Sequence, residues 1–125
     1  MNLSQTLFRT ARRIPGGVAV IERDRTELSY QQLADQVLRL AGALRTLGVG
    51  PGDRVGLLMK NCAQYIELLY ACWAAGACAV PINARLHPRE SAFVLDDAGA
   101  TVVFVTEDAD CSAIEAIQNK ESEND

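Results

Sequence analysis

The stretch RVGLLMKNCAQYIELLYACWAAGACAVPINARLHPRESAFVLDDAGATVVFV, residues 54–105, decides the fold of this chain. It contains three apolar runs of strand length: 54–59, 77–82 and 101–105. Two segments of helical length separate these runs: 61–75 and 88–98. Because the runs lack polar alternation, they predict strands of a parallel sheet covered on both faces. Leu57, Val80 and Val103 are each 23 residues apart, which suits one strand plus one crossover helix. We therefore expect a three-layer α/β fold with a mostly parallel sheet and flanking helices.

Smaller elements are predicted in front of this sheet. Residues 2–13 fit a short amphipathic helix with apolar residues on one side and arginines near its end: Leu3, Leu7 and Phe8, then Arg9, Arg12 and Arg13. We expect the apolar side to dock on its own domain, with contact to a membrane surface as the alternative. Residues 18–22 and 26–29, joined by a turn at 24–25, predict a small antiparallel hairpin.

A long helix is predicted directly after the hairpin. Ser29, followed three residues later by Gln32, forms a capping box, and Gly48 ends the helix. Apolar residues recur at helical spacing and predict one buried stripe: Leu33, Val37, Leu40, Ala41, Leu44 and Leu47. The next segment, Gly48–Asp53, has the composition of a nucleotide-binding glycine loop, but it follows a helix and precedes a strand. We interpret it as a turn.

The helix predicted at 61–75 is apolar on nearly all sides. Asn61 is placed to cap its first turn, with Gln64 three residues further on. Only Gln64 and Glu67 are expected to be exposed. A helix this apolar is covered on most sides, so it indicates partner surface that lies outside this chain.

The helix predicted at 88–98 begins with Pro88 at its first position. Its apolar contacts are expected from four side chains: Phe93, Val94, Leu95 and Ala98. The pair Asp96 and Asp97 suits a solvated helix end better than a metal or phospho-acceptor site, because it does not follow a strand. A last helix is predicted at 109–118. The domain organisation is therefore one incomplete domain, 1–118, followed by a polar acidic tail, 119–125.

Composition and charge exclude several classes of protein. The 125 residues are 49% hydrophobic and 22% charged, which is typical of a globular domain. The net charge of −4 and the scattered arginines disfavour nucleic-acid binding. The longest uncharged run, Leu68–Ala84, contains Gly76 and Pro81 and is too short for a transmembrane segment. With no secretory signal at the N-terminus, we expect a cytoplasmic protein.

The four cysteines do not predict a metal site: Cys62, Cys72, Cys78 and Cys111. None belongs to a C-x-x-C pair, and the single histidine, His87, is not in metal-ligand spacing with a cysteine. Three of the cysteines fall in apolar helix or strand segments, so we expect buried, reduced thiols.

The loop NARLHP, residues 83–88, follows the second predicted strand. Ligands of open α/β sheets bind at the carboxyl ends of the strands, so this loop is the candidate binding segment. Arg85 and His87 are its ionisable residues. Solvated loop positions are the simpler interpretation of both, and Arg85 as an anion contact is the alternative.

Five segments in order resemble the adenylate-forming, or AMP-binding, enzymes: LSYQQL (28–33), GVGPGDRV (48–55), WAAGACAVPIN (73–83), NARLHPRE (83–90) and DAGATVVF (97–104). This family includes acyl-CoA synthetases, peptide-synthetase adenylation domains and luciferases. The resemblance covers about residues 3–108 and is closest to bacterial long-chain fatty or aryl acyl-CoA synthetases. It implies an enzyme that turns a carboxylate and ATP, with Mg²⁺, into an acyl-adenylate and then a CoA thioester.

The same resemblance implies that this chain is only the N-terminal part of such an enzyme. The family's glycine-rich loop followed by lysine, its acidic residues for Mg²⁺ and ribose, and its late catalytic lysine have no match, since the only lysines are Lys60 and Lys120. We therefore expect no catalytic residue, no metal ligand and no bound cofactor in the chain alone. Arg85 matches a basic position that approaches the nucleotide phosphate of CoA in some members of the family.

Two other interpretations stay open. The chain could be a non-catalytic α/β module that binds a partner protein through its apolar helix 62–75. A flavodoxin-like or receiver-like domain is disfavoured, because neither a phosphate loop nor an acidic pocket follows the first parallel strand. For the incomplete enzyme, the expected partners are the missing C-terminal part of the fold or a second copy bound through exposed apolar surface.

Overall fold

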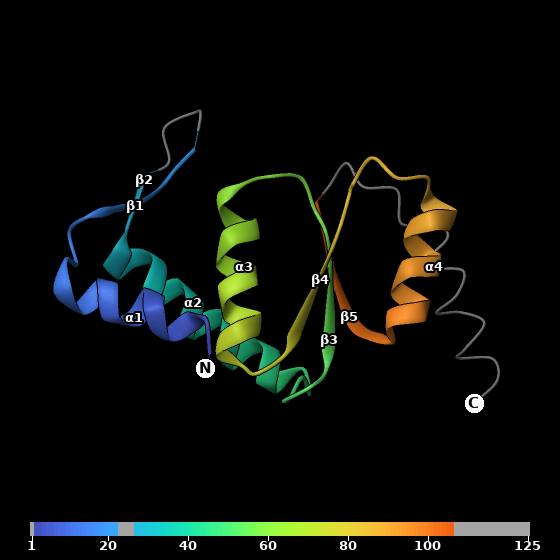
Figure 1. Cartoon of the computed structure of the whole chain (residues 1–125), viewed down its shortest axis with the longest axis horizontal. Helices are drawn as coiled ribbons and strands as arrows, with labels where there is room; N and C mark the ends of the chain where they lie inside the picture. Colours follow the sequence, from blue (N-terminus) through green and yellow to red (C-terminus); the bar gives the residue numbers. More distant parts are fainter. Residues whose placement is uncertain (1, 23–26, 107–125) are drawn as a thin grey trace. The chain divides into compact units, whose positions relative to one another are not determined.

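The computed structural model describes residues 2–22 and 27–106, and its elements confirm an α/β fold with a parallel sheet (Figure 1). In chain order they are α1 (Ser4–Arg13), β1 (Val18–Ile21), β2 (Glu27–Ser29), α2 (Tyr30–Thr46), β3 (Arg54–Leu58), α3 (Ala63–Ala74), β4 (Cys78–Ile82), α4 (Pro88–Ala98) and β5 (Ala100–Val105). Contacts divide the chain into two compact units. Unit 1 comprises residues 1–53 and 61–79, and unit 2 comprises residues 54–60 and 80–125.

Helix α1 docks on unit 1 through its apolar side, as the sequence predicts. Leu7 and Ala11 are buried, one turn apart, and the three arginines of the helix are exposed. Leu3 was expected on the buried side but is 55% exposed, because it lies at the N-cap, before the first helical turn. Asn2 holds this end of the helix: its Oδ1 accepts hydrogen bonds from the Ser4 backbone N–H and from the Ser4 hydroxyl.

The hairpin of β1 and β2 is antiparallel, as predicted, with Val20 opposite Leu28 and Ile21 opposite Glu27. The predicted turn at 24–25 lies outside the described residues. Val20 points into the core of unit 1, whereas Ile21 on the other face is 72% exposed. This alternation is what a two-stranded ribbon with one covered face requires.

Helix α2 begins with the predicted capping box. The Gln32 backbone N–H donates to Ser29 Oγ at 3.1 Å, and the Ser29 N–H donates to Gln32 Oε1 at 2.9 Å. The predicted stripe is buried at four positions: Leu33, Val37, Ala41 and Leu44. Leu47 was wrongly included, since it is the C-cap and is 61% exposed. Gly48 follows with a φ of 89°, a left-handed conformation that glycine adopts without strain.

Helix α3 begins one residue later than the sequence predicts. Its N-cap is Cys62, in an extended conformation and without a side-chain cap, so the assignment of Asn61 as the cap was wrong. Side chains from elsewhere in unit 1 satisfy carbonyls at the other end of the helix. Asn2 Nδ2 donates to the Trp73 carbonyl, and Arg45 donates to the Ala74 carbonyl at 3.4 Å. These side chains supply hydrogen-bond donors to carbonyls of the last turn, which has no further turn of the helix to provide them.

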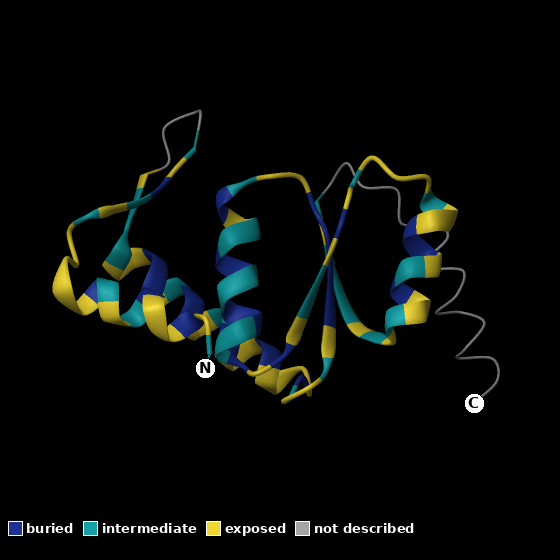
Figure 2. Cartoon of the chain, viewed as in Figure 1, coloured by how far each residue is buried: buried dark blue, intermediate teal, exposed yellow. Residues whose placement is uncertain are grey.

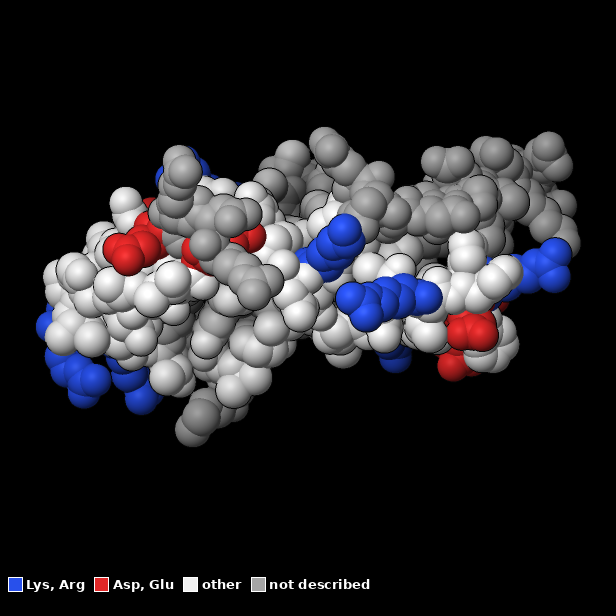
Figure 3. Space-filling model, turned by 90° about the horizontal axis from the view of Figure 1, so that it is seen from above, with Lys and Arg blue, Asp and Glu red and all other residues white. Residues whose placement is uncertain are grey.

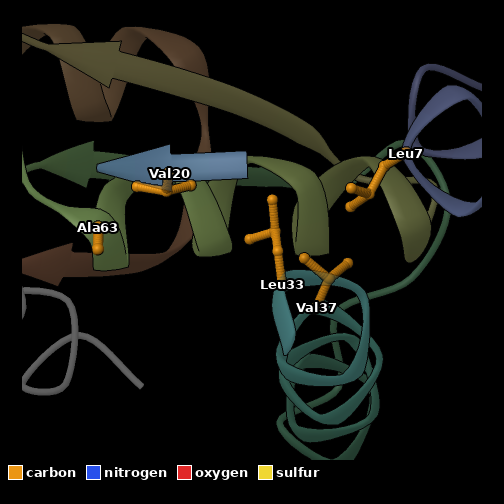
Figure 4. Close-up of a cluster of buried hydrophobic side chains, with 5 residues drawn as sticks. All are labelled: Leu7, Val20, Leu33, Val37 and Ala63. Atoms are coloured by element: carbon orange, nitrogen blue, oxygen red, sulfur yellow. The ribbon is translucent and has the colours of Figure 1, made fainter. Parts of the chain in front are cut away.

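The core of unit 1 gathers side chains from α1, β1, α2 and α3, as Figure 4 shows: Leu7, Val20, Leu33, Val37 and Ala63. Partly buried aromatic residues close around it, among them Phe8, Tyr30 and Tyr70. Tyr70 meets Trp73 edge to face, with ring centroids 5.1 Å apart. Unit 1 is therefore a small helical core capped by a hairpin.

The sheet has the strand order β4-β3-β5, with β3 in the middle. Strands β3 and β5 are parallel, and Gly56 pairs with Val103 while Leu57 pairs with Phe104. In unit 2, α4 packs against β3 and β5, and its buried residues lie on the side toward the strands (Figure 2). Gly56 makes this approach possible, because a Cβ at that position would lie 2.3 Å from Leu95 Cδ2.

Two expectations for unit 2 were wrong in detail. Phe93 was expected to pack inward from α4, but it is 69% exposed, because the inward side carries Ser91, Ala92 and Leu95. The run 101–105 was expected to be buried, yet every residue of β5 is half-buried or exposed. Pro88 does occupy the first turn of α4, and Asp96 and Asp97 are solvated at its end. The predicted helix 109–118, the tail 119–125 and the boundary between them lie outside the described residues.

The cysteines differ in exposure more than the sequence predicts. Cys72 is buried, but Cys62 is only half-buried and Cys78 is exposed at the start of β4. Cys111 lies outside the described residues. Within the parts of the chain that the structure describes, no helix is long and apolar enough to cross a membrane.

Candidate functional site

The candidate site lies at the carboxyl edge of the sheet, where the loops after the strands begin. Lys60 follows β3, the loop 83–87 follows β4, and Thr106 follows β5. The Lys60 backbone N–H donates to Thr106 Oγ1 at 3.3 Å, which ties the ends of β3 and β5 together in unit 2. This hydrogen bond fixes the ends of two strands at the edge where the loop after β4 begins.

Asn83 fixes the shape of the loop between β4 and α4. Its Oδ1 accepts a hydrogen bond from the Arg85 backbone N–H at 2.9 Å, and its carbonyl accepts one from the Leu86 N–H at 3.1 Å. Such a turn is typical of asparagine, whose short side chain can reach the backbone two residues on. The Arg85 backbone is thus held in place while its side chain is exposed.

His87 serves as the N-cap of α4. Its Nδ1 accepts a hydrogen bond from the Arg89 backbone N–H at 3.1 Å, and its carbonyl accepts bonds from Glu90 and Ser91. This geometry requires an unprotonated Nδ1. The structure therefore gives His87 a part in starting the helix, beyond the solvated loop position that the sequence suggests.

The Arg85 guanidinium has no hydrogen-bond or ion-pair partner among residues 2–22 and 27–106. Arg89, in the first turn of α4, is exposed as well. Arg89 was not predicted as a site residue, although its place just after Pro88 could have pointed to it. Figure 3 shows how basic side chains extend from the surface singly or in small groups. Because a guanidinium is planar, the exposed Arg85 side chain can supply two parallel N–H donors to a phosphate.

The glycine-rich segment 48–53 does not form a phosphate loop. The Gly50 N–H donates to Asp53 Oδ2 at 2.7 Å, and the Gly52 N–H donates to the Gly76 carbonyl at 3.1 Å. Two amides that a phosphate would need are therefore already bonded within unit 1. The interpretation of this segment as a turn between α2 and β3 is confirmed.

The described residues do not fit a magnesium site. Among them, no three carboxylate, imidazole or thiol groups converge as ligands of a metal ion. Burial is the main cause that raises the pKa of three groups of α3: Tyr65, Glu67 and Cys72. No carboxylate in this part of the chain is thus arranged for metal-assisted chemistry.

Comparison with known proteins agrees with this geometry. A model of the family "AMP-binding enzyme" matches residues 7–125. A feruloyl-CoA synthase from Amycolatopsis is 46% identical over 98 residues, which cover 78% of this chain and 20% of that protein. A fatty acyl CoA synthetase structure from Mycobacterium tuberculosis superposes with a TM-score of 0.87 and 36% identity, covering 94% of this chain and 23% of that one. The N-terminal domain of FACL13 from the same organism gives a TM-score of 0.87 at 35% identity, covering 94% of this chain and 30% of that domain. The chain thus spans about a fifth of the length of the curated relative.

Proposed function

Because the chain belongs to the AMP-binding enzyme family, we propose that it is the N-terminal part of an ATP-dependent acyl-CoA synthetase. The complete enzyme joins a carboxylate to AMP, releases pyrophosphate, and then transfers the acyl group to the thiol of CoA. The observation that carries this proposal is the match of nearly the whole chain to the N-terminal domain of a solved relative. Feruloyl-CoA and fatty acyl-CoA synthetases among the relatives favour an aromatic or fatty carboxylate as substrate.

The chain alone does not form an adenylate in this proposal. Only two lysines, Lys60 and Lys120, are present, and neither follows a glycine-rich loop that could hold a triphosphate. No cluster of three possible metal ligands occurs in the described residues, and no residue among them is assigned to Mg²⁺. ATP, Mg²⁺ and CoA would bind to the complete fold. The remaining part of that fold is the proposed partner of this chain, and the proposed location is the cytoplasm.

Arg85 is the residue of this chain that we assign to CoA. It lies at the carboxyl edge of the sheet, its backbone is held by Asn83, and its guanidinium is unpaired within the described residues. A guanidinium recognises a phosphate through two parallel hydrogen bonds. We assign the phosphate on the ribose of CoA to this contact.

Pyrophosphate exchange tests the proposed lack of activity. The purified chain is offered ATP, Mg²⁺ and either ferulic acid or a long-chain fatty acid, and the expected exchange equals that of a blank. A complete relative serves as the positive control. Exchange above the blank that survives repurification would contradict the proposal, because it would require a triphosphate site within this chain.

Calorimetry with CoA and with dephospho-CoA tests Arg85 separately. We expect weak binding of CoA, weakened about tenfold when the ribose phosphate is absent and about as much in Arg85→Ala. Arg85→Lys should retain part of the affinity, and Arg9→Ala, an exposed arginine of α1, should retain all of it. Equal binding of the two ligands would refute the Arg85 assignment and leave the family-based proposal intact.

A further inference from the structure

Glu67 is a carboxylic acid in the core of unit 1. It is only 8% exposed, although the sequence predicts an exposed position. It lies one helical turn from Ala63 and one turn from Ala71, both of which are buried. Ala63 belongs to the core cluster with residues of α1, β1 and α2. Glu67 therefore extends from the inward face of α3, where an apolar side chain would be expected.

Among residues 2–22 and 27–106, one amide and no cation act on the Glu67 carboxyl group. The Gln36 side chain, from α2, donates a hydrogen bond to its carboxyl group. Glu22, directly after β1, is the charged group that acts on it, and its charge has the same sign. Helices α1 and α2 pack against α3 and carry further charged groups: Arg9, Arg12, Arg13, Asp35, Arg39 and Arg45. All six are exposed.

Two of these charged groups have partners of their own. Asp35 accepts a hydrogen bond from the Gln31 side chain at 2.8 Å, and Arg45 donates to the Ala74 carbonyl at 3.4 Å. None of the six is among the groups that act on the Glu67 carboxyl. An ionised Glu67 would thus be a buried charge with a like charge nearby, and the described part of the chain offers it a single donor.

We propose that Glu67 makes the packing of α2 against α3 pH-dependent: the interface is tighter when the carboxyl group carries a proton and looser when it is ionised. In the protonated form, the group is neutral, small and bonded to Gln36 across the two helices. In the ionised form, it draws water toward the interface and repels Glu22. The protonation state of Glu67 thus affects α3, α2 and the end of β1 together.

The direction of the pH effect follows from the folded and unfolded states. Burial raises the pKa of Glu67 above its ordinary value of 4.5, the charge of Glu22 raises it further, and the bond from Gln36 lowers it. The folded chain therefore binds this proton more tightly than the unfolded chain does. The resulting stability is fully present below about pH 4.5 and is lost as the pH rises through the folded pKa.

Unfolding of the full chain by urea between pH 4 and pH 8 tests the proposal. Glu67→Gln keeps the shape of the side chain but cannot ionise. It should lower the unfolding equilibrium constant at pH 7 roughly threefold or more, and it should remove part of the loss of stability between pH 4.5 and 7. Glu27→Gln, at an exposed carboxylate of β2, is the matched control and should leave that loss unchanged. If Glu67→Gln and Glu27→Gln give the same pH profile, the proposal is overturned.

Direct titration of Glu67 by NMR keeps the test decisive if a variant changes the fold. In the unaltered chain, the Glu67 carboxyl carbon should titrate at a higher pH than the ordinary value of 4.5 for a glutamate. Glu22→Gln should lower the Glu67 midpoint, because it removes the like charge, and Gln36→Ala should raise it, because it removes the donor. A Glu67 midpoint at the ordinary value would overturn the proposal.

Discussion

The two units of the chain bury their apolar residues to different degrees. Unit 1 surrounds its core with α1, the hairpin, α2 and α3, and Val37 and Leu44 are almost completely buried. In unit 2, a smaller core cluster joins Leu58, Ile82 and Leu95, and Val55 and Leu57 of β3 are also completely buried. Strand β5 of this unit, the run richest in β-branched residues, remains half-exposed. A strand pattern in a sequence thus predicts which residues are suited to burial. Whether they are buried depends on what packs against the strand.

This difference has a physical meaning for the proposed function. Parallel strands read as continuous apolar runs when both faces are covered. In unit 2, α4 supplies cover from one helix, yet Val105 and Phe93 remain exposed. The larger fold that we propose for the complete enzyme would provide the further surface that these side chains suit. The contrast between the units therefore supports an incomplete sheet more directly than the absence of a motif does.

The largest expected effect comes from removing core side chains in the two units. Leu33→Ala in unit 1 should lower the free energy of unfolding by about 3 kcal/mol, because it leaves a cavity among side chains from several elements. Leu95→Ala in unit 2 should cost less, about 2 kcal/mol, because the thinner core can relax around it. Urea unfolding measured by circular dichroism checks both values. Leu38→Ala, at a position of α2 that is 57% exposed, should change stability by less than about 0.5 kcal/mol. Equal losses at Leu33 and Leu95 would break the comparison between the units.

A smaller effect is expected at Gly56, where the contact between β3 and α4 is closest. Gly56→Ala should destabilise the chain by about 2 kcal/mol, because the new Cβ would overlap Leu95 Cδ2. Adding Leu95→Ala should cost less than the sum of the single changes, since the shortened side chain leaves room. Gly42→Ala, in α2, meets nothing within 4 Å and should stabilise the chain by about 0.5 kcal/mol. Thermal unfolding of the four variants measures these values, and a neutral Gly56→Ala would show that α4 does not press on the sheet.

Much of this fold could be predicted from local rules. The capping box at Ser29, Pro88 at the start of α4 and the three strand runs each depend on a few neighbouring residues, and each was confirmed. Burial was predicted less well, because it depends on what packs against a helix. Glu67 was expected to be exposed but is buried, and Phe93 was expected to be buried but is exposed. Periodicity does not say how wide the covered face of a helix is.

The candidate site could be predicted only as a location. The rule on carboxyl ends of strands points to the loop at 83–88, and the structure places Arg85 there, with no partner for its guanidinium in the described part of the chain. The cap formed by His87 Nδ1 on the Arg89 N–H could not be predicted, because histidine is an uncommon N-cap. The contact of Arg85 with CoA stays a prediction for calorimetry.

Cys72 is expected to have the smallest effect on stability near neutral pH, and the labelling of its thiol measures how often unit 1 opens. Burial raises the pKa of the Cys72 thiol to about 11 from an ordinary value of 9.0, and the nearby Cys78 adds to this. Iodoacetamide at pH 8 should therefore modify Cys78 rapidly and Cys72 only on unfolding, as mass spectrometry of the peptides will show. Because the folded chain holds the Cys72 proton more tightly, the stability from this group is present below about pH 9 and is lost as the pH rises through 11. Leu33→Ala should speed the labelling of Cys72 by loosening the core of unit 1, whereas Leu38→Ala should not. Equal rates at Cys72 and Cys78 in the unaltered chain would mean that unit 1 opens far more readily than its packing implies.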